Sequence, residues 1–152
     1  MTEVVYKPLD ASVNKDSPKD DKISWEKICL LYGRRITASR SVNGLSVATL
    51  YTVPTGKLFL LTSGNLSAAT TGAGIFNALL AVSATATGGG TDIDIIRMEI
   101  EGSGTSCPYS GILPLRAVAG EKFNLESGNA ALEASACIVG YEIDADIFYK
   151  LM

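Results

Sequence analysis

Paired acidic residues come nearest to a chemical site in this chain of 152 residues. Asp92 and Asp94 stand two positions apart, as do Asp144 and Asp146, a spacing that places both side chains on one face of a strand. A calcium site needs about six to eight oxygen ligands, usually drawn from several such groups. We therefore interpret these pairs as ordinary surface carboxylates, with no metal bound.

Histidine is absent from the sequence. Ser-His-Asp and Cys-His arrangements are therefore excluded, and the commonest general base is missing. Glu99 and Glu101 share one strand face, so they do not face each other across a substrate bond as the carboxylates of a glycosidase do. The segment Thr55-Gly56-Lys57 lacks the earlier Gly and the following Ser or Thr of a phosphate-binding loop. We expect no enzyme and no cofactor.

Three cysteines are widely spaced and form no CxxC pair: Cys29, Cys107 and Cys137. Without histidine as a further ligand, this pattern predicts buried free thiols rather than a disulfide framework or a zinc site.

The charge balance excludes further classes of partner. The formal net charge is −3, whereas binding to nucleic acid needs clustered Lys and Arg. We interpret the small basic group of Arg34, Arg35 and Arg40 as a solvated strand face. No apolar run reaches the roughly 18 to 20 residues that span a bilayer. We expect neither a nucleic acid nor a membrane as partner.

Residues 1–24 differ from the rest of the chain because they are polar and mix charges of both signs. Alone, such a segment buries too little apolar surface to offset the entropy lost on ordering. It is either a disordered tail or an extended N-terminal arm that orders on a neighbouring subunit. Its few apolar side chains would anchor such an arm: Val4, Val5, Tyr6 and Leu9.

Residues 25–152 are expected to form one β-sandwich domain. The expected strands are Val47–Val53, Lys57–Thr62, Leu66–Thr71, Ile75–Thr87, Asp92–Glu101, Ile112–Ala117, Leu132–Asp144 and Ile147–Leu151. In Asp92–Glu101 the apolar side switches partway along, which indicates either a bulge or a strand that crosses between sheets. Short strands separated by Gly and Pro turns indicate an all-β fold, a jelly-roll-like or Greek-key β-sandwich.

Two segments remain open between helix and strand at this point, 25–33 and 75–82. Trp25, Ile28, Cys29 and Tyr32 fit helical spacing, but we favour a strand from Leu30 onward. For the second segment, alternating Val, Ala and Thr downstream favour a strand.

One phrase occurs twice, as TGKLFLLTSGN from Thr55 and as AGEKFNLESGN from Ala119. In both copies Gly predicts a turn, and Phe and Leu two positions apart predict one inward face of a strand. Ser-Gly-Asn predicts a tight turn at the end of each copy. The inward pairs are Phe59 with Leu61 and Phe123 with Leu125.

The two copies differ on the opposite face. The second copy carries Lys122, Asn124 and Glu126 there, which predicts a face in contact with solvent. The first carries Leu58 and Leu60, an apolar patch that must be covered. The cover is either the chain's own N-terminal segment or loop, or a subunit interface.

The segments LYTVPTGKLFLLTSGNLSA and LPLRAVAGEKFNLESGNAALEASACIVGYEI resemble the small β-sandwich proteins of tailed-phage virions. These include capsid decoration (cement) proteins and related tail or fibre modules. The matching elements are the turn at Val53–Lys57 and the closing Gly140-Tyr141-Glu142. The resemblance covers residues 46 to 145.

This resemblance implies a bacteriophage structural protein that clamps the capsid non-covalently. It implies a homo-oligomer, a trimer, with an N-terminal arm reaching neighbouring subunits. The implied partners are other copies of the chain and the major capsid protein or another virion protein. The implied location is the virion, assembled in the host cytoplasm. The alternative is a receptor- or carbohydrate-binding module of a tail fibre, for which Tyr109 is the best loop aromatic.

Overall fold

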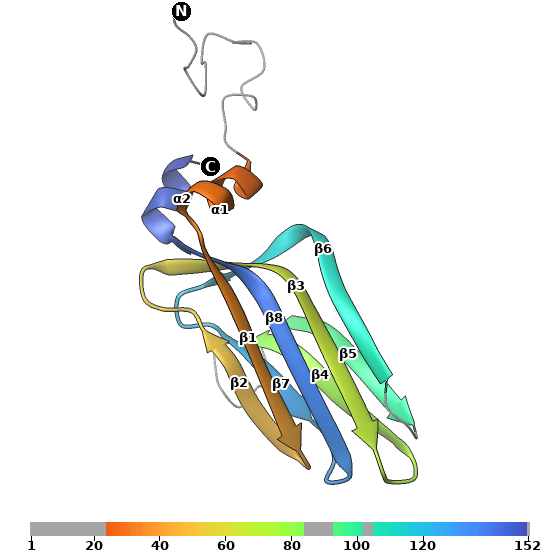
Figure 1. Ribbon diagram of the computed structural model, residues 1–152. Helices are drawn as coiled ribbons and strands as arrows, with labels where there is room; N and C mark the ends of the chain where they lie inside the picture. Colours follow the sequence, from red (N-terminus) through yellow and green to blue (C-terminus); the bar gives the residue numbers. More distant parts are fainter. Residues whose placement is uncertain (1–23, 84–92, 102–104, 152) are drawn as a thin grey trace, which may run out of the picture.

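The computed structural model describes residues 24–83, 93–101 and 105–151, and gives the backbone alone for 105–114 (Figure 1). Eight strands form most of it: β1 (Arg34–Asn43), β2 (Ser46–Thr52), β3 (Lys57–Thr70), β4 (Ile75–Ser83), β5 (Ile93–Glu101), β6 (Thr105–Val118), β7 (Lys122–Ser127) and β8 (Leu132–Asp144). Two short helices flank them, α1 (Trp25–Tyr32) and α2 (Ala145–Leu151).

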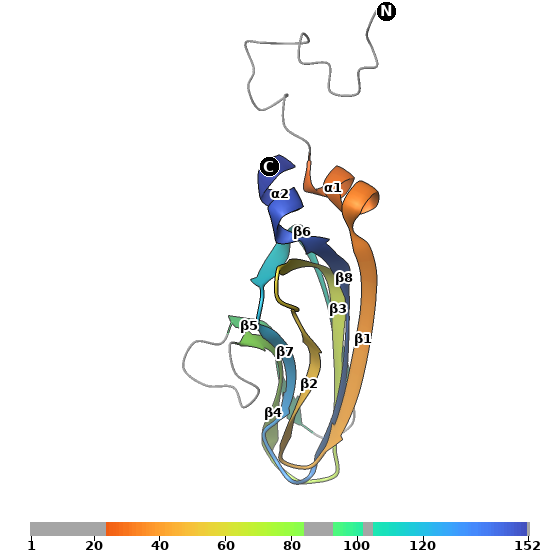
Figure 2. The same ribbon diagram turned by 90° about the vertical axis from the view of Figure 1, so that its left-hand side faces the viewer.

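The strands form two antiparallel four-stranded sheets that face each other (Figure 2). The strand orders are β1-β8-β3-β6 and β2-β7-β4-β5, so nearly every connection crosses from one sheet to the other. The expected all-β sandwich is confirmed. The N-terminal arm expected at 1–24 lies almost wholly outside the described residues.

The main core lies between the sheets, and both copies of the repeated phrase contribute to it. The rings of Phe59 and Phe123 meet edge to face with centroids 5.1 Å apart, and Leu61 and Leu125 are fully buried beside them. The glycines that start the two copies have positive φ, 78° at Gly56 and 90° at Gly120. The predicted turns and inward pairs are therefore confirmed.

The two copies end differently. In the second copy β7 stops at Ser127, as the predicted turn requires. In the first copy the predicted turn at Ser63-Gly64-Asn65 is wrong, because β3 runs on to Thr70. These residues pair with β8 on one side and β6 on the other, and a register shift after Leu61 absorbs the irregularity. Pairing on both sides outweighs the local turn propensity of the sequence.

The polar face predicted for the second copy is only partly solvated. Lys122 and Glu126 are half-buried, but Asn124 is fully buried, so that part of the prediction is wrong. The Thr49 hydroxyl of β2 donates a hydrogen bond of 2.9 Å to Asn124 Oδ1. A neighbouring strand therefore supplies the partner that burial of an amide requires.

Both ends of the described chain are helical where strands were expected. The strand favoured from Leu30 begins only at Arg34, as β1, because residues Trp25–Tyr32 form α1. The hydroxyl of Ser24, the N-cap, accepts from the Lys27 amide, and Gly33 is the C-cap. The final strand expected at Ile147–Leu151 is wrong, because this segment is α2. Asp146 in its first turn and Lys150 in its last turn stabilise the helix, because their charges complement the helix dipole.

The remaining strand predictions hold where the structure describes them. β4 confirms a strand from Ile75, and the rest of the expected Ile75–Thr87 lies outside the described residues. Of the two alternatives for Asp92–Glu101, the bulge is confirmed, because Leu80 pairs with Ile96 and Ala81 with Asp94, which skips Ile95. β8 alternates between buried and less buried residues from Leu132 as predicted.

We expect Gly140→Ala to lower the free energy of unfolding by about 3 kcal/mol. An added Cβ would lie 2.3 Å from the Leu60 carbonyl oxygen and 2.5 Å from Phe59 Cζ, and the backbone cannot yield cheaply. Gly56→Ala is the control, because nothing lies within 4 Å of a Cβ added there. Only the strain of an alanine at positive φ should lower its free energy of unfolding, by about 1 kcal/mol. Urea unfolding measures both variants, and equal losses would contradict the close packing at Gly140.

Candidate interaction surface

A second, smaller core lies on the outer face of the first sheet, at the end that carries both helices (Figure 2). Leu58 and Leu60 of β3 project into it and are 2% and 1% exposed. The chain's own helices and β8 cover them with Ile28, Cys29, Ile143 and Phe148. The sequence left two possible covers for these leucines, a segment of the same chain or a neighbouring subunit, and the structure shows that the same chain covers them. Leu58 and Leu60 therefore offer no exposed surface to a partner.

The inner faces of the helices explain their position. Ile28 and Cys29 of α1 and Phe148 of α2 are buried, and each large side chain contributes roughly 1.5 to 3 kcal/mol of stability. Burial, followed by the charge of Glu26, raises the pKa of Cys29 to about 11, so this thiol stays protonated at neutral pH. The buried free thiol predicted at Cys29 is confirmed. Cys137 is half-buried, and the side chain of Cys107 lies outside the described residues.

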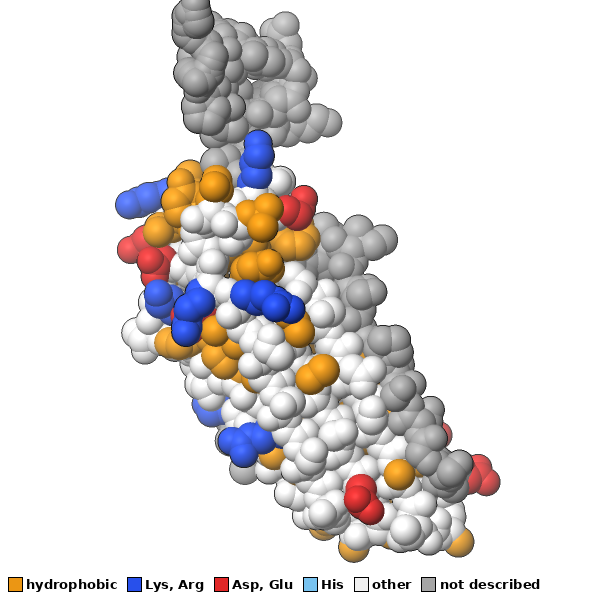
Figure 3. All heavy atoms as spheres, viewed as in Figure 1, with side chains coloured by type: hydrophobic (Ala, Val, Ile, Leu, Met, Phe, Trp, Pro, Cys, Tyr) orange, Lys and Arg blue, Asp and Glu red, His pale blue; other side chains and the backbone are white. Residues whose placement is uncertain are grey.

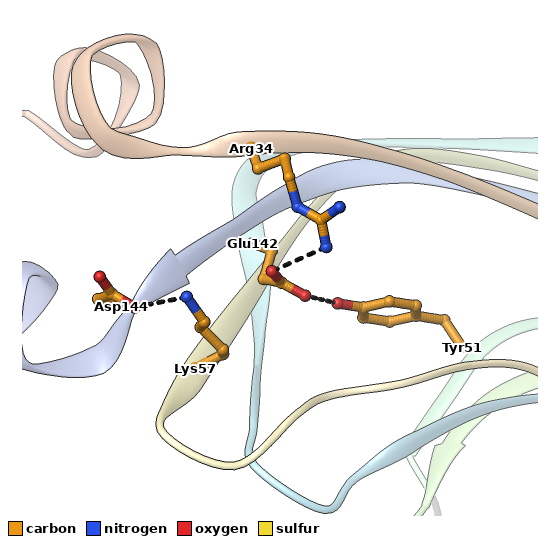
Figure 4. A network of polar contacts seen from close by, with 5 residues as sticks. All are labelled: Arg34, Tyr51, Lys57, Glu142 and Asp144. Atoms are coloured by element: carbon orange, nitrogen blue, oxygen red, sulfur yellow. Dashed lines mark hydrogen bonds and ion pairs between the residues drawn. The ribbon is translucent and has the colours of Figure 1, made fainter.

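A polar network ties the strands together beneath the helices (Figure 4). Glu142 of β8 is 6% exposed and accepts hydrogen bonds from the Tyr51 hydroxyl of β2 and from Arg34 Nη2 of β1, the latter at 3.1 Å. Lys57 Nζ contacts Asp144 Oδ1 at 2.6 Å, between the start of β3 and the end of β8. The carboxylate of Glu142 thus links the two sheets.

The protonation states in this network suit a structural role. Burial alone would raise the pKa of Glu142, but hydrogen bonds from Tyr51 and Arg34 and the charges of Arg34 and Lys57 hold it below its usual value. Burial, then the hydrogen bond and charge of Glu142, raise the pKa of Tyr51. At neutral pH Glu142 is therefore ionised and Tyr51 protonated. The arrangement holds charge in place, and neither group is poised to move a proton.

The two motifs that carry the resemblance meet in this network. The turn at Val53–Lys57 leads into β3, and Gly140-Tyr141-Glu142 lies beside it in β8, with Phe59 opposite Glu142 and Lys57 opposite Asp144. The spacing of the turn and the closing strand thus has a physical basis here, because Gly140 leaves room for the Phe59 ring and Glu142 binds Tyr51 and Arg34.

Apolar side chains are exposed around the helices, over a surface that we call the helical pole. It comprises Leu30 (76% exposed), Leu31 (64%), Tyr32 (49%), Val118 (42%) and Tyr149 (56%). Figure 3 shows hydrophobic side chains gathered over this end of the molecule. The guanidinium of Arg116 lies 5.8 Å from the centre of the Tyr149 ring. Large apolar side chains grouped at one place mark an interaction site more often than scattered ones do.

The sequence alone does not reveal the helical pole, because 25–33 is left open between helix and strand and a strand is favoured from Leu30. The helical spacing of Trp25, Ile28, Cys29 and Tyr32 was the available signal. Once Ile28 and Cys29 face inward, the geometry of the helix turns Leu30 and Leu31 outward.

The predicted anchors of the arm cannot be placed: Val4, Val5, Tyr6 and Leu9 lie outside the described residues. The point of attachment is described, because Ser24 caps α1. Residues 1–23 therefore join the molecule at the helical pole.

Asp92 lies outside the described residues, so the pair with Asp94 cannot be assessed. Among the residues that the structure describes, no group of three or more Cys, Asp or Glu could hold an ion. Asp94 instead contacts Arg97 Nη2 at 2.8 Å, and Asp144 contacts Lys57. No helix among the described residues is long and apolar enough to cross a membrane.

A groove of about 470 Å³ lies on the outer face of the second sheet. Leu45, Val47 and Leu79 give it an apolar lining, and Arg97 and Glu126 add charge. No aromatic ring lines it among the described residues, although most carbohydrate sites present one. The side chain of Tyr109 lies outside the described residues.

Comparisons with known proteins give distant likenesses only. No family model matches the chain, and no curated protein matches it. A pentameric capsid protein isolated from metagenomic phage sequences aligns over 95% of this chain and 76% of its own, with 19% identity and a TM-score of 0.43. A chain of the cyanophage Pam1 capsid aligns over 73% and 86%, with 16% identity and a TM-score of 0.43.

A protein of Bacillus endospore appendages, which form disulfide-linked pili, aligns over 74% of this chain and 89% of its own, with 13% identity and a TM-score of 0.36. Phage capsid proteins are thus among the solved structures that this chain resembles. At such scores no function is carried over from any of them.

We expect Glu142→Gln to lower the free energy of unfolding at pH 7 by about 2 kcal/mol, because Arg34 and Tyr51 lose a charged acceptor. The depressed pKa of Glu142 stabilises the fold above the carboxyl's ordinary value of 4.5, and this contribution is lost as the pH falls through the folded-state pKa. The difference between variant and wild type should therefore shrink in urea unfolding as the pH is lowered from 7 to below 4.5.

Glu133→Gln is the matched control, because Glu133 is an exposed residue of the same strand. A difference between Glu142→Gln and wild type that stays constant with pH would contradict the stabilising role of the ionised carboxylate.

Proposed function

We propose that the chain is a non-enzymatic virion structural protein that decorates and stabilises a phage capsid. The observation that carries the proposal is the helical pole, where five large apolar side chains are exposed beside the attachment point of residues 1–23. The sequence resemblance to decoration proteins supports it independently, through motifs that meet just beneath this pole.

The construction of the pole supports a binding role. The inner faces of α1 and α2 are fixed on the second core, and Arg34, Tyr51 and Glu142 brace the strands below. A surface held rigid in this way loses little entropy on binding. The centre of the helical pole is apolar, and Lys27, Arg116 and Lys150 lie nearby. This composition is that of a protein–protein interface rather than of a catalytic cleft.

The partners in this proposal are other copies of the chain, as a trimer, and the major capsid protein or another virion protein. The arm of residues 1–24, anchored by Val4, Val5, Tyr6 and Leu9, reaches onto a neighbouring subunit. The complex belongs to the virion and assembles in the host cytoplasm. Several weak contacts made at once give avidity beyond that of any single interface.

The alternative function, a receptor- or carbohydrate-binding module of a tail fibre, has one observation in its favour, the groove on the second sheet. Its aliphatic lining among the described residues suits a sugar ring poorly. Binding on a glycan array that is lost on Leu79→Arg would favour this alternative.

We expect Leu30→Glu/Leu31→Glu to weaken co-sedimentation with capsid shells by about tenfold or more, because two apolar contacts become buried charges. The shells are purified from the virus whose genome carries the gene. Ala130→Glu is the control: this alanine is exposed in the turn between β7 and β8, at the end of the sandwich away from the helices. Equal binding by both variants would contradict the role of the helical pole.

We expect deletion of residues 1–23 to weaken the same binding while the sandwich stays folded, because Ser24 still caps α1. Thermal unfolding checks the fold, and co-sedimentation checks the binding. If the deletion variant is unfolded, residues 1–23 are required for the fold itself. If its binding is unchanged, residues 1–23 are not part of the interface.

A further inference from the structure

The edge strands β1 and β5 carry opposite net charge. The sheet orders put the edge strands β1 and β2 on one side and β5 and β6 on the other. In Figure 3, Lys and Arg side chains gather over the side of β1, with a few Asp and Glu side chains near the helices, and further Asp and Glu side chains lie towards the lower right, on the side of β5.

The first side is basic. β1 contains Arg34, Arg35 and Arg40, and neither β1 nor β2 contains an acidic residue. Arg34 contacts the buried Glu142 but stays 71% exposed, and Arg40 Nε donates to the Thr49 carbonyl, which leaves its charge uncompensated. Arg35 is exposed and has no ion pair within the described residues.

On the second side β5 is acidic, whereas the described part of β6 carries the exposed Arg116 at the helical pole. Asp94 and Arg97 of β5 neutralise each other at 2.8 Å. Glu99 and Glu101 are exposed on the same strand and have no ion pair among the described residues. Two negative charges thus stand at the edge opposite the arginines.

Both sides also expose apolar side chains and unpaired strand edges. Leu45 (74% exposed) and Val47 (40%) lie beside the basic edge, and Ile93 (53%) lies on β5. Within the described chain, the outer edges of β1 and β5 have no strand partner. The unpaired backbone groups of such edges can bind a strand of another chain, and complementary charge determines which two edges pair.

We infer that the occupant of the basic β1–β2 side is the acidic β5 side of a second copy of this chain. A twofold dimer through either side would set arginines against arginines or glutamates against glutamates. Joining unlike sides instead pairs opposite charges and generates a head-to-tail ring. This inference rests on the self-association proposed above and names its two faces.

Charge reversal on each side tests the pairing. The acidic-β1 variant is Arg35→Glu/Arg40→Glu, and the basic-β5 variant is Glu99→Lys/Glu101→Lys. Each variant sets like charges against each other, so we expect self-association about tenfold weaker or lost, with a mass near the 16.0 kDa of one chain. The four substitutions combined in one chain restore opposite charges and should restore the oligomer. Mixing the two variants should restore pairwise association between unlike chains, but not a closed ring with an odd number of subunits such as the trimer.

Light scattering after size-exclusion chromatography measures the mass, thermal unfolding confirms that each variant is folded, and Glu133→Lys serves as the control on another face. The pairing would be overturned if either charge-reversed variant associates like wild type, or if the variant with all four substitutions stays monomeric. Neither result would bear on the proposed binding to the capsid. A monomeric wild-type chain would overturn self-association itself, whereas co-sedimentation with shells tests the virion role separately.

Discussion

The pairing of β3 with β8 is the contact on which the rest of the structure depends. At the start of β3 both faces of the strand are buried: Phe59 and Leu61 face the core between the sheets, and Leu58 and Leu60 face the second core beneath the helices. Four consecutive buried side chains are typical of a central strand covered on both sides. The close approach of β8 depends on Gly140, since any side chain there would meet the Leu60 carbonyl and the Phe59 ring.

The two helices and the polar network follow from this double burial. α1 and α2 are too short to be stable alone, so they persist only because Ile28, Cys29 and Phe148 pack onto Leu58 and Leu60. The same packing turns Leu30 and Leu31 towards the outside. Below the helices, Glu142 is ionised because Tyr51 and Arg34 satisfy it, and it links the two sheets. The exposed apolar surface of the helical pole is therefore a consequence of how the fold closes this end of the sandwich.

Features that depend on alternation and turn residues could be predicted from the sequence. The inward pairs of the repeated phrase, the turns at Gly56 and Gly120 and the bulge in β5 all follow from local patterns. Ser63-Gly64-Asn65 could not be placed, because strand pairing on both sides overrides a turn signal that is real in the second copy. The sequence predicts that Leu58 and Leu60 are covered. It does not predict what covers them, because the sequences of the two short helices are also compatible with strands. The buried Asn124 depends on a partner in another strand, Thr49, which no local pattern reveals.

The central claim is that the second core belongs to the cooperative fold and is not a cap that opens by itself. Native-state hydrogen exchange of Phe148→Ala tests it most directly. We expect the amides of Phe59 and Leu61 in β3 to lose as much protection as those of α1, because loss of Phe148 weakens the packing on Leu58 and Leu60. Loss of protection confined to α1 and α2, with β3 unchanged, would contradict it.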